Sequence, residues 1–213
     1  MKYLTLDTCV WLELIKISLH SGDDLFDEIC FWIENGHITH ITTENLIREW
    51  DRNKVNKFQE ISKHGKALQL QAIAPFRGTP ELKSAYQPDA IEDIVMRRMD
   101  RVDEILKICS ETALENAEIL NDAVQRNLHC LAPNHSEDSF RDTVNILTLL
   151  NHIKTRRYQN CCFSTLNYSD FSEAKSKKHA LHPALIDIFK EAELEYVYCD
   201  EEPFGNKLFG VKL

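Results

Sequence analysis

The sequence predicts an α/β protein with a central parallel sheet flanked by helices. Three observations carry this prediction. Residues 3–6 form a short apolar run that is followed at once by a helical pattern. A second run typical of a strand, residues 37–43, comes only after another helical stretch. The alternation of strands and helices then returns between residues 139 and 200. Strands separated by helices in this way usually pair in parallel, in a sheet covered by those helices.

The first two helices are predicted from apolar spacing and from stop signals. Residues 9–19 carry apolar side chains at helical intervals, and the pattern breaks at residues 21–23, which are Ser, Gly and Asp. A second helix is predicted over residues 25–34. Asn35 and Gly36 follow it, and such residues commonly end a helix. The chain therefore crosses from the first strand to the second through two helices.

The second strand leads into a long helix. Residues 37–43 are rich in β-branched side chains and predict the strand. Thr43 is a suitable N-cap for a helix that continues from residue 44 to about residue 68. Over residues 69–90 the periodicity is lost while prolines recur, so we expect an irregular connection there.

The middle of the chain is predicted to be helical. Two stretches, about residues 90–109 and 111–128, have helical spacing and no strand signal. Together with the preceding connection they predict a helical insertion at about residues 69–131. A chain of 213 residues is most simply one domain, so we expect residues 1–213 to form a single unit that contains this insertion.

The last third of the chain returns to strands and helices. Residues 139–154 predict a strongly amphipathic helix, and the apolar residues 158–165 predict a strand. Residues 172–181 are polar and basic and are predicted to form a loop. His182 and Pro183 open the next predicted helix, and residues 195–200 predict the last strand. The chain beyond that strand shows no clear element.

Composition limits the class of protein. Hydrophobic residues make up 43% of the chain and charged residues 28%, which is ordinary for a globular protein. No run of 18 apolar residues and no secretory signal pattern occurs, so we expect a cytoplasmic protein outside the membrane. The seven scattered cysteines lack a CxxC pair and indicate reduced thiols. A net charge of −9 argues against indiscriminate nucleic-acid binding, yet it allows a nuclease with a local basic patch.

Acidic and amide side chains occur near the predicted strand ends. Asp7 directly follows the first strand, where it either caps the next helix or lies at the ligand-binding edge of the sheet. The others are Glu49, Asp142, Asn167 and Asp170. Each has an ordinary alternative as a surface ion pair, a first-turn acid or an Asx turn. If they share one cleft, their mutual repulsion favours a bound divalent cation and the chemistry of phosphodiester hydrolysis.

Four segments resemble the motifs of PIN domains, a family of FEN-like metal-dependent nucleases. LTLDTCVWLELI is similar to the family's opening strand and first acid. TTENLIREW resembles the second segment and selects Glu49 over Glu44. FRDTVNILTLL resembles the third and selects Asp142 over Asp138. FSTLNYSDF resembles the last, in the T-x-N-x-x-D-F form of larger bacterial PIN-like proteins. The resemblance implies a three-layer PIN-like fold.

The resemblance also implies roles for the acids. Asp7, Glu49 and Asp142 are expected to bind Mg²⁺ or Mn²⁺ and to position the attacking water. Asn167 stands where many members have a fourth acid, and Asp170 either replaces that acid or holds the loop. The number of metal ions is left open.

Further residues near the last strand are expected to contact the substrate. Thr165 is expected to orient a water or a phosphate group. Lys175, Lys177 and Lys178 follow the last motif and are the preferred phosphate-contacting patch, against the alternative of a solvated loop. Cys9 departs from the family pattern, in which Asn is common at that position.

The sequence therefore predicts a divalent-metal-dependent endonuclease that acts on phosphodiester bonds. Single-stranded RNA is the favoured substrate, and DNA is left open. The alternative is a PIN-fold module with impaired catalysis that binds nucleic acid or protein. A homodimer and a regulatory protein partner are further expectations. A haloacid-dehalogenase-type phosphatase fits less well, because it needs an acid where this chain has Cys9.

Overall fold

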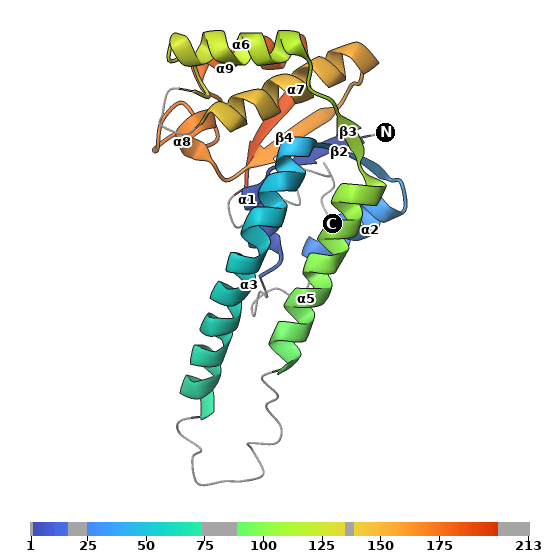
Figure 1. The fold of residues 1–213 in the computed structure, drawn as a ribbon, viewed down its shortest axis with the longest axis vertical. Helices are drawn as coiled ribbons and strands as arrows, with labels where there is room; N and C mark the ends of the chain where they lie inside the picture. Colours follow the sequence, from blue (N-terminus) through green and yellow to red (C-terminus); the bar gives the residue numbers. More distant parts are fainter. Residues whose placement is uncertain (1, 17–24, 74–88, 135–138, 200–213) are drawn as a thin grey trace.

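The computed structural model describes residues 2–16, 25–73, 89–134 and 139–199 (Figure 1). The predicted break at residues 21–23, most of the predicted irregular connection over 69–90 and the tail after residue 200 lie outside the described residues. Among the helices that the structure describes, none is both long and apolar enough to cross a membrane.

Five strands form one sheet in the order β3-β2-β1-β4-β5, and every neighbouring pair is parallel. The strands are β1 (Lys2–Leu6), β2 (Ile38–Thr43), β3 (Glu111–Ala113), β4 (Cys161–Thr165) and β5 (Leu194–Tyr198). From β1 the chain builds one side of the sheet through β2 and β3, and then crosses back to build the other side through β4 and β5. The predicted parallel sheet is therefore confirmed.

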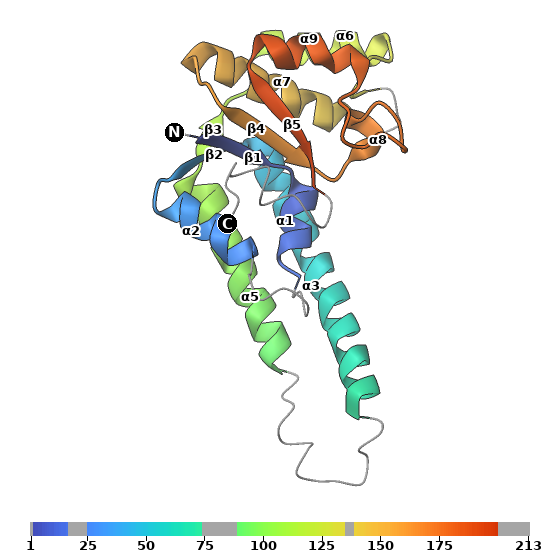
Figure 2. The same ribbon diagram turned by 180° about the vertical axis from the view of Figure 1, so that it is seen from behind.

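Helices cover both faces of the sheet and give three layers (Figures 1 and 2). One face carries α1 (Thr8–Leu14), α2 (Leu25–Glu34), the first turns of α3 (Glu44–Ile73), the end of α5 (Asp89–Glu104) and the π-helix η2 (Ile105–Cys109). The other face carries α6 (Ala117–Leu128), α7 (Phe140–Arg156) and α9 (Pro183–Glu191). The short helix α8 (Tyr168–Phe171) follows β4. The predicted three-layer α/β fold is confirmed.

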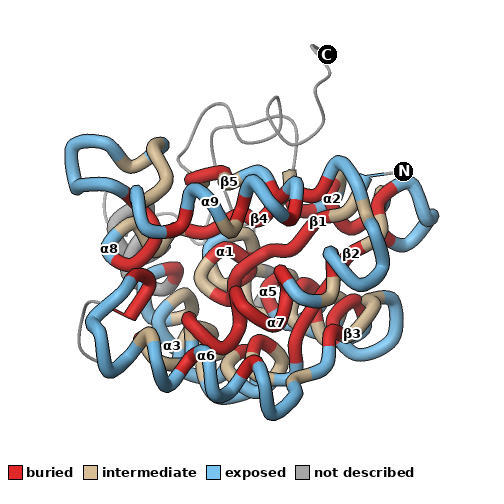
Figure 3. Tube along the Cα trace, turned by 90° about the horizontal axis from the view of Figure 1, so that it is seen from above, coloured by how far each residue is buried: buried red, intermediate tan, exposed pale blue. Residues whose placement is uncertain are grey.

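Each face of the sheet has its own apolar core. On one face, Trp11, Phe26 and Trp50 are fully buried against β1. On the other, Phe163 and Phe189 pack among the inner side chains of α7 and α9. Figure 3 shows the strands and the inner helix surfaces as buried, with the exposed segments around them. A parallel sheet buried on both faces explains why its strands are apolar runs without strict alternation.

The helices α3 and α5 extend side by side away from the sheet (Figures 1 and 2). Their base is fixed by Trp50, whose Nε1 donates a 2.6 Å hydrogen bond to Asp103. Lys54 donates to both oxygens of the same carboxylate at 2.7–2.8 Å. Where α3 and α5 leave the sheet, they are therefore joined by a hydrogen bond from buried Trp50 and by the ion pair between Lys54 and Asp103.

The sequence prediction was wrong for residues 111–113. A helix was expected from residue 111, but Glu111–Ala113 forms the edge strand β3 and pairs with Ile41–Thr43 of β2. The helix α6 begins only after Asn116, whose side chain accepts a hydrogen bond from the N–H of Ile119. The three-residue strand is too short to give a periodic signal, and its neighbours favour helix. The single-domain assignment with an insertion at about 69–131 stays a prediction.

Candidate active site

The predicted acids follow strands at the carboxyl edge of the sheet. Asp7 comes directly after β1, and Thr165 is the last residue of β4. These neighbouring strands pair in register at Leu6 and Ser164, and the N–H of Asp7 donates to the carbonyl of Ser164 at 2.9 Å. The strand order changes direction between β1 and β4, and open parallel sheets bind their ligands at such a switch point.

Asp7 is buried, with 7% of its surface exposed, and both of its carboxylate oxygens accept hydrogen bonds. Oδ1 accepts from the N–H of Thr8 at 2.7 Å, so Asp7 does cap α1. Oδ2 accepts from the hydroxyl of Thr165 at 2.5 Å and from the thiol of Cys9 at 3.3 Å. Burial raises the pKa of Asp7, the hydrogen bonds oppose that rise, and the charge of Asp170 adds to it. The helix cap and a position among other acids are thus compatible.

Cys9 and Thr165 link Asp7 to the chain that leaves β4. The N–H of Leu166 donates to the Cys9 sulfur at 3.2 Å, and the N–H of Asn167 donates to the Thr165 hydroxyl at 2.9 Å. Burial and the nearby charge of Asp7 raise the pKa of the Cys9 thiol well above its usual value. Cys9 is therefore a neutral donor to Asp7 at the position where the resemblance suggests Asn.

Asn167 bridges two acids. Its Nδ2 amide group donates to Oδ2 of Asp142 and to Oδ2 of Asp170, both at 2.9 Å. Its own oxygen accepts from the hydroxyl of Ser169 at 2.7 Å. Burial, the charges of Asp7, Asp170 and Glu49, and a hydrogen bond to Asp170 raise the pKa of Asp142 to about 9. Asn167 thus bridges two carboxyl groups that lie within hydrogen-bonding distance of each other.

Glu49 completes the group of acids from the other side. It is half-buried on α3, and burial together with the charge of Asp7 raises its pKa. A hydrogen bond with Thr8 and the charges of Arg52 and Arg141 oppose the rise. Glu44, the acid that the motif did not select, is exposed and pairs with Arg48 at 2.6 Å. The structure thus places Glu49 close enough to Asp7 for the charge of Asp7 to raise the pKa of Glu49.

The four carboxyl groups and one amide gathered here have the ligand chemistry of a hard divalent cation. Burial, and then the charge of neighbouring carboxylates, raises the pKa values of Asp7, Glu49 and Asp142. Within the described part of the chain, no three His, Cys, Asp or Glu side chains converge in an arrangement ready to hold a metal ion. Asp142 and Asp170 instead accept from the Asn167 amide. The donor set fits the cation, and the Asn167 amide occupies one oxygen each of Asp142 and Asp170.

The three predicted phosphate-contacting lysines lie in the loop between α8 and α9, at the same end of the sheet. Lys175 is exposed. Lys177 pairs with Glu173 at 2.5 Å on the surface, and such a pair contributes little free energy. The Lys178 ammonium lies over the rings of Tyr168 and Tyr198, 4.9 and 5.3 Å from their centroids. The three lysines therefore differ in their surroundings.

Sequence reasoning missed several neighbours of the acids. Thr8 gave no signal beyond its position after Asp7, and Cys9 was recognised only as a departure from the family pattern. Tyr168 and Tyr198 gave no signal, because their relation to Lys178 depends on the folding of three separate segments. The hydroxyl of Thr43 accepts from the N–H of Leu46 at 3.1 Å, so its predicted capping role is confirmed.

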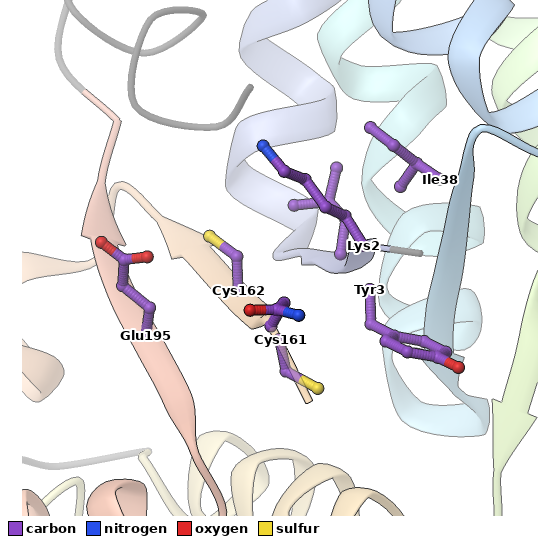
Figure 4. Close-up of a pocket in the computed structure, with 8 residues that line it drawn as sticks. Lys2, Tyr3, Ile38, Cys161, Cys162 and Glu195 are labelled. Carbon is purple, nitrogen blue, oxygen red and sulfur yellow. The ribbon is translucent and has the colours of Figure 1, made fainter. Parts of the chain in front are cut away.

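A small cavity lies at the opposite, amino edge of the sheet and is distinct from the acidic site. It encloses about 150 Å³ between the first residues of β1, β2 and β4 and the start of β5. Figure 4 shows Lys2, Cys162 and Glu195 around it. The length of the strands separates this cavity from Asp7 and Thr165.

Comparison with known proteins assigns a family to this arrangement. A family model described as PIN domain matches residues 4–171, from β1 to the end of α8. No curated protein and no solved structure matches the chain. The matched residues cover most of the sequence and include the five predicted catalytic residues, from Asp7 to Asp170. PIN domains are generally nucleases, and many use divalent metal ions. Because of this match, the chain belongs to the PIN domain family.

Proposed function

We propose that this protein is a divalent-metal-dependent endonuclease that hydrolyses phosphodiester bonds in single-stranded RNA. The observation that carries the proposal is the clustering of Asp7, Glu49 and Asp142 at the carboxyl edge of the sheet, where the charge of Asp7 raises the pKa values of both Glu49 and Asp142. Crowded acids with raised pKa values destabilise a fold, so their presence favours a functional role.

Each side chain of the site would have a separate role in phosphodiester hydrolysis. The carboxylates of Asp7, Glu49 and Asp142 would hold Mg²⁺ or Mn²⁺ and orient the attacking water. The cation would supply positive charge against the charge that develops on the phosphate. Thr165 would hold Asp7 in place, and it is the candidate for orienting a water or a phosphate group. Asp170 would take the fourth-acid role once Asn167 released it.

The proposal also covers the type of PIN domain, the phosphate contacts, the location of the protein and its partners. We assign the chain to the larger PIN-like type, because its last motif reads T-x-N-x-x-D-F from Thr165 to Phe171. Lys175, Lys177 and Lys178 would contact substrate phosphates. A cytoplasmic location, a homodimer and a regulatory protein partner complete the proposal. The bridging amide of Asn167, found where many members have an acid, favours the alternative of a binding module with impaired catalysis.

A cleavage assay separates the two functions. The wild type and Asp7→Asn are incubated with end-labelled RNA and DNA of the same unpaired sequence, with Mg²⁺, Mn²⁺ or EDTA. We expect internal cleavage of RNA by the wild type with a cation. In Asp7→Asn we expect a loss exceeding the roughly 10–100-fold that follows removal of an outer-shell metal partner. The exposed Asp187→Asn on α9 is the matched control. Equal trace activity in the wild type and Asp7→Asn would refute the nuclease, and RNA binding without cleavage would support the module.

A metal titration gives a readout that does not depend on activity. Mn²⁺ binding is followed by electron paramagnetic resonance in the wild type, Asp7→Asn and Asp187→Asn. We expect Asp7→Asn to weaken binding and Asp187→Asn to leave it unchanged. Equal Mn²⁺ affinity in all three proteins would show that the cation does not bind at Asp7, and would contradict the proposed metal site.

A further inference from the structure

Two tyrosines, a lysine and a histidine form a cluster beside the acidic site. The members of this aromatic–lysine corner are Tyr168, Lys178, His179 and Tyr198. Tyr168 opens α8 directly after Asn167, the residue that bridges two of the acids. Tyr198 ends β5 and is paired with Thr165 in the sheet. The corner therefore lies at the same edge of the sheet as Asp7, beyond the ends of the next two strands, β4 and β5.

Lys178 is held in this corner by its backbone as well as by its side chain. Its carbonyl oxygen accepts from the hydroxyls of Ser172 at 2.7 Å and Tyr196 at 3.1 Å. Its ammonium group lies over both Tyr168 and Tyr198. In the described part of the chain Lys178 forms no salt bridge, whereas its neighbour Lys177 is paired with Glu173. The two rings thus fix the position of the Lys178 ammonium group beside the acidic site.

The rings differ in how far they reach the solvent. Tyr198 is buried, at 8% exposure, and supports the cluster from the inside. Tyr168 is half-buried, and its ring meets Tyr198 edge to face with centroids 6.4 Å apart. His179 is exposed and packs edge to face on Tyr198 at 5.6 Å. Tyr168 and His179 are therefore the aromatic surfaces that an outside group can reach.

We propose that the aromatic–lysine corner binds an unpaired nucleotide of the substrate strand, next to the bond that is cleaved. The base stacks on the accessible surface of Tyr168 and His179, and the adjoining phosphate contacts Lys178. This inference rests on the proposed function, because the acidic site defines which bond is cleaved. It goes beyond that function by assigning the residues that select an unpaired base next to the cleaved bond.

Two physical arguments favour this ligand. A chain with a net charge of −9 gains little from long-range attraction to a polyanion, so short-range contacts must supply the affinity. Stacking of a base on an aromatic ring contributes roughly 1–3 kcal/mol and works for any base. A base inside a duplex is already stacked on its neighbours and cannot reach such a ring. The corner therefore selects single strands by their accessible bases.

Binding is tested apart from cleavage, in full-length protein carrying Asp7→Asn. The probe is a fluorescent single-stranded RNA, measured by anisotropy, and a second RNA carries 2-aminopurine to report stacking. We expect Tyr168→Leu to weaken binding by about 5-fold or more, as loss of one stacked base implies. We expect Tyr168→Phe, which keeps the ring, to bind as before and to quench 2-aminopurine. The same RNA as a full duplex should bind with equal affinity to the Asp7→Asn protein and to the protein that also carries Tyr168→Leu.

Matched variants exclude loss of folding as the cause. Tyr158→Leu removes a tyrosine that stacks on Tyr3 at the opposite edge of the sheet, so it should not affect RNA binding. Lys178→Gln should weaken binding and lower its salt dependence, whereas Lys190→Gln on the exposed end of α9 should not. Unchanged affinity and unchanged 2-aminopurine fluorescence in a folded Tyr168→Leu protein would overturn the inference.

The test also separates this inference from the proposed function. Ring-dependent binding by a protein that cleaves nothing would support the corner and refute the nuclease. Cleavage of single strands and duplexes at equal rates, unchanged by Tyr168→Leu, would support the nuclease and refute the corner.

Discussion

The hydroxyl of Thr165 donates a 2.5 Å hydrogen bond to Oδ2 of Asp7 and joins the carboxyl ends of β4 and β1. The same hydroxyl accepts from the N–H of Asn167 at 2.9 Å. One side chain therefore orients the first acid and the segment that carries Asn167 and Asp170. Because the two strands are neighbours at the switch point of the sheet, this contact fixes the relative positions of the acids.

Removing the Thr165 hydroxyl should impair cleavage without leaving a cavity in the core. Thr165→Val keeps the shape of the side chain but cannot donate to Asp7, so we expect cleavage to fall roughly 10–100-fold, as is typical for a partner of a metal ligand. Thr165→Ser should stay within a few-fold of the wild type. Initial cleavage rates on the labelled RNA provide the measurement. The control is Thr148→Val on α7, whose buried hydroxyl has no hydrogen-bond partner among the described residues. Full activity in Thr165→Val would contradict this role.

The sequence could predict the sheet and its carboxyl edge because both depend on local patterns. Apolar runs alternating with helices imply parallel strands, and the positions after those strands then share one edge. Motif spacing selected Glu49 over Glu44, and the structure places Glu49 beside Asp7 and Glu44 in a surface ion pair. The bridge made by Asn167 could not be predicted, since it joins a helix and a turn 25 residues apart. The strand β3 was missed because three residues show no period.

The Cys9 thiol should react slowly with alkylating agents. Burial and the charge of Asp7 raise its pKa well above the usual value, so little thiolate forms at pH 8. Cys130 is exposed and serves as the internal comparison. We expect iodoacetamide to label Cys130 well before Cys9, as followed by mass spectrometry of tryptic peptides over time. Equal labelling rates would contradict the environment described for Cys9.

Asp142→Asn should stabilise the fold at neutral and mildly alkaline pH. The folded chain keeps the Asp142 proton up to about pH 9, whereas the unfolded chain releases it near 3.8. The free energy of unfolding should therefore fall as pH rises through this window. His40 acts oppositely, because burial lowers its pKa from 6.5 to about 3. Its contribution to the free energy of unfolding rises with pH between these two values and no longer changes above about pH 7. We therefore assign the fall in the free energy of unfolding between pH 7 and 9 to the buried acids, above all to Asp142.

The asparagine variant removes this pH-dependent loss while keeping the size of the side chain. We expect it to raise the free energy of unfolding at pH 8 by about 1 kcal/mol or more, which is roughly 2–4 °C in Tm for a domain of this size. Melting curves in EDTA between pH 6 and 9 should show a flatter profile than the wild type. Asp187→Asn, on the exposed surface of α9, should reproduce the wild-type slope. If the Tm of Asp142→Asn still fell steeply with pH, the pH-dependent loss of stability would belong to another group.

Asn167→Asp tests whether the acids act together on a cation. The substitution replaces an amide that donates to Asp142 and Asp170 by a third carboxyl group, so two hydrogen bonds are lost and a further acid is crowded into the site. In EDTA we expect the free energy of unfolding to drop by roughly 1–3 kcal/mol. Added Mn²⁺ should then raise the Tm of Asn167→Asp more than that of the wild type, since the new carboxylate is a further oxygen ligand. Asn167→Ala loses the same hydrogen bonds without adding a ligand, so it should be destabilised in EDTA but gain no extra shift from Mn²⁺. If Mn²⁺ shifted all three proteins equally, the carboxylates around Asn167 would not form a shared cation site.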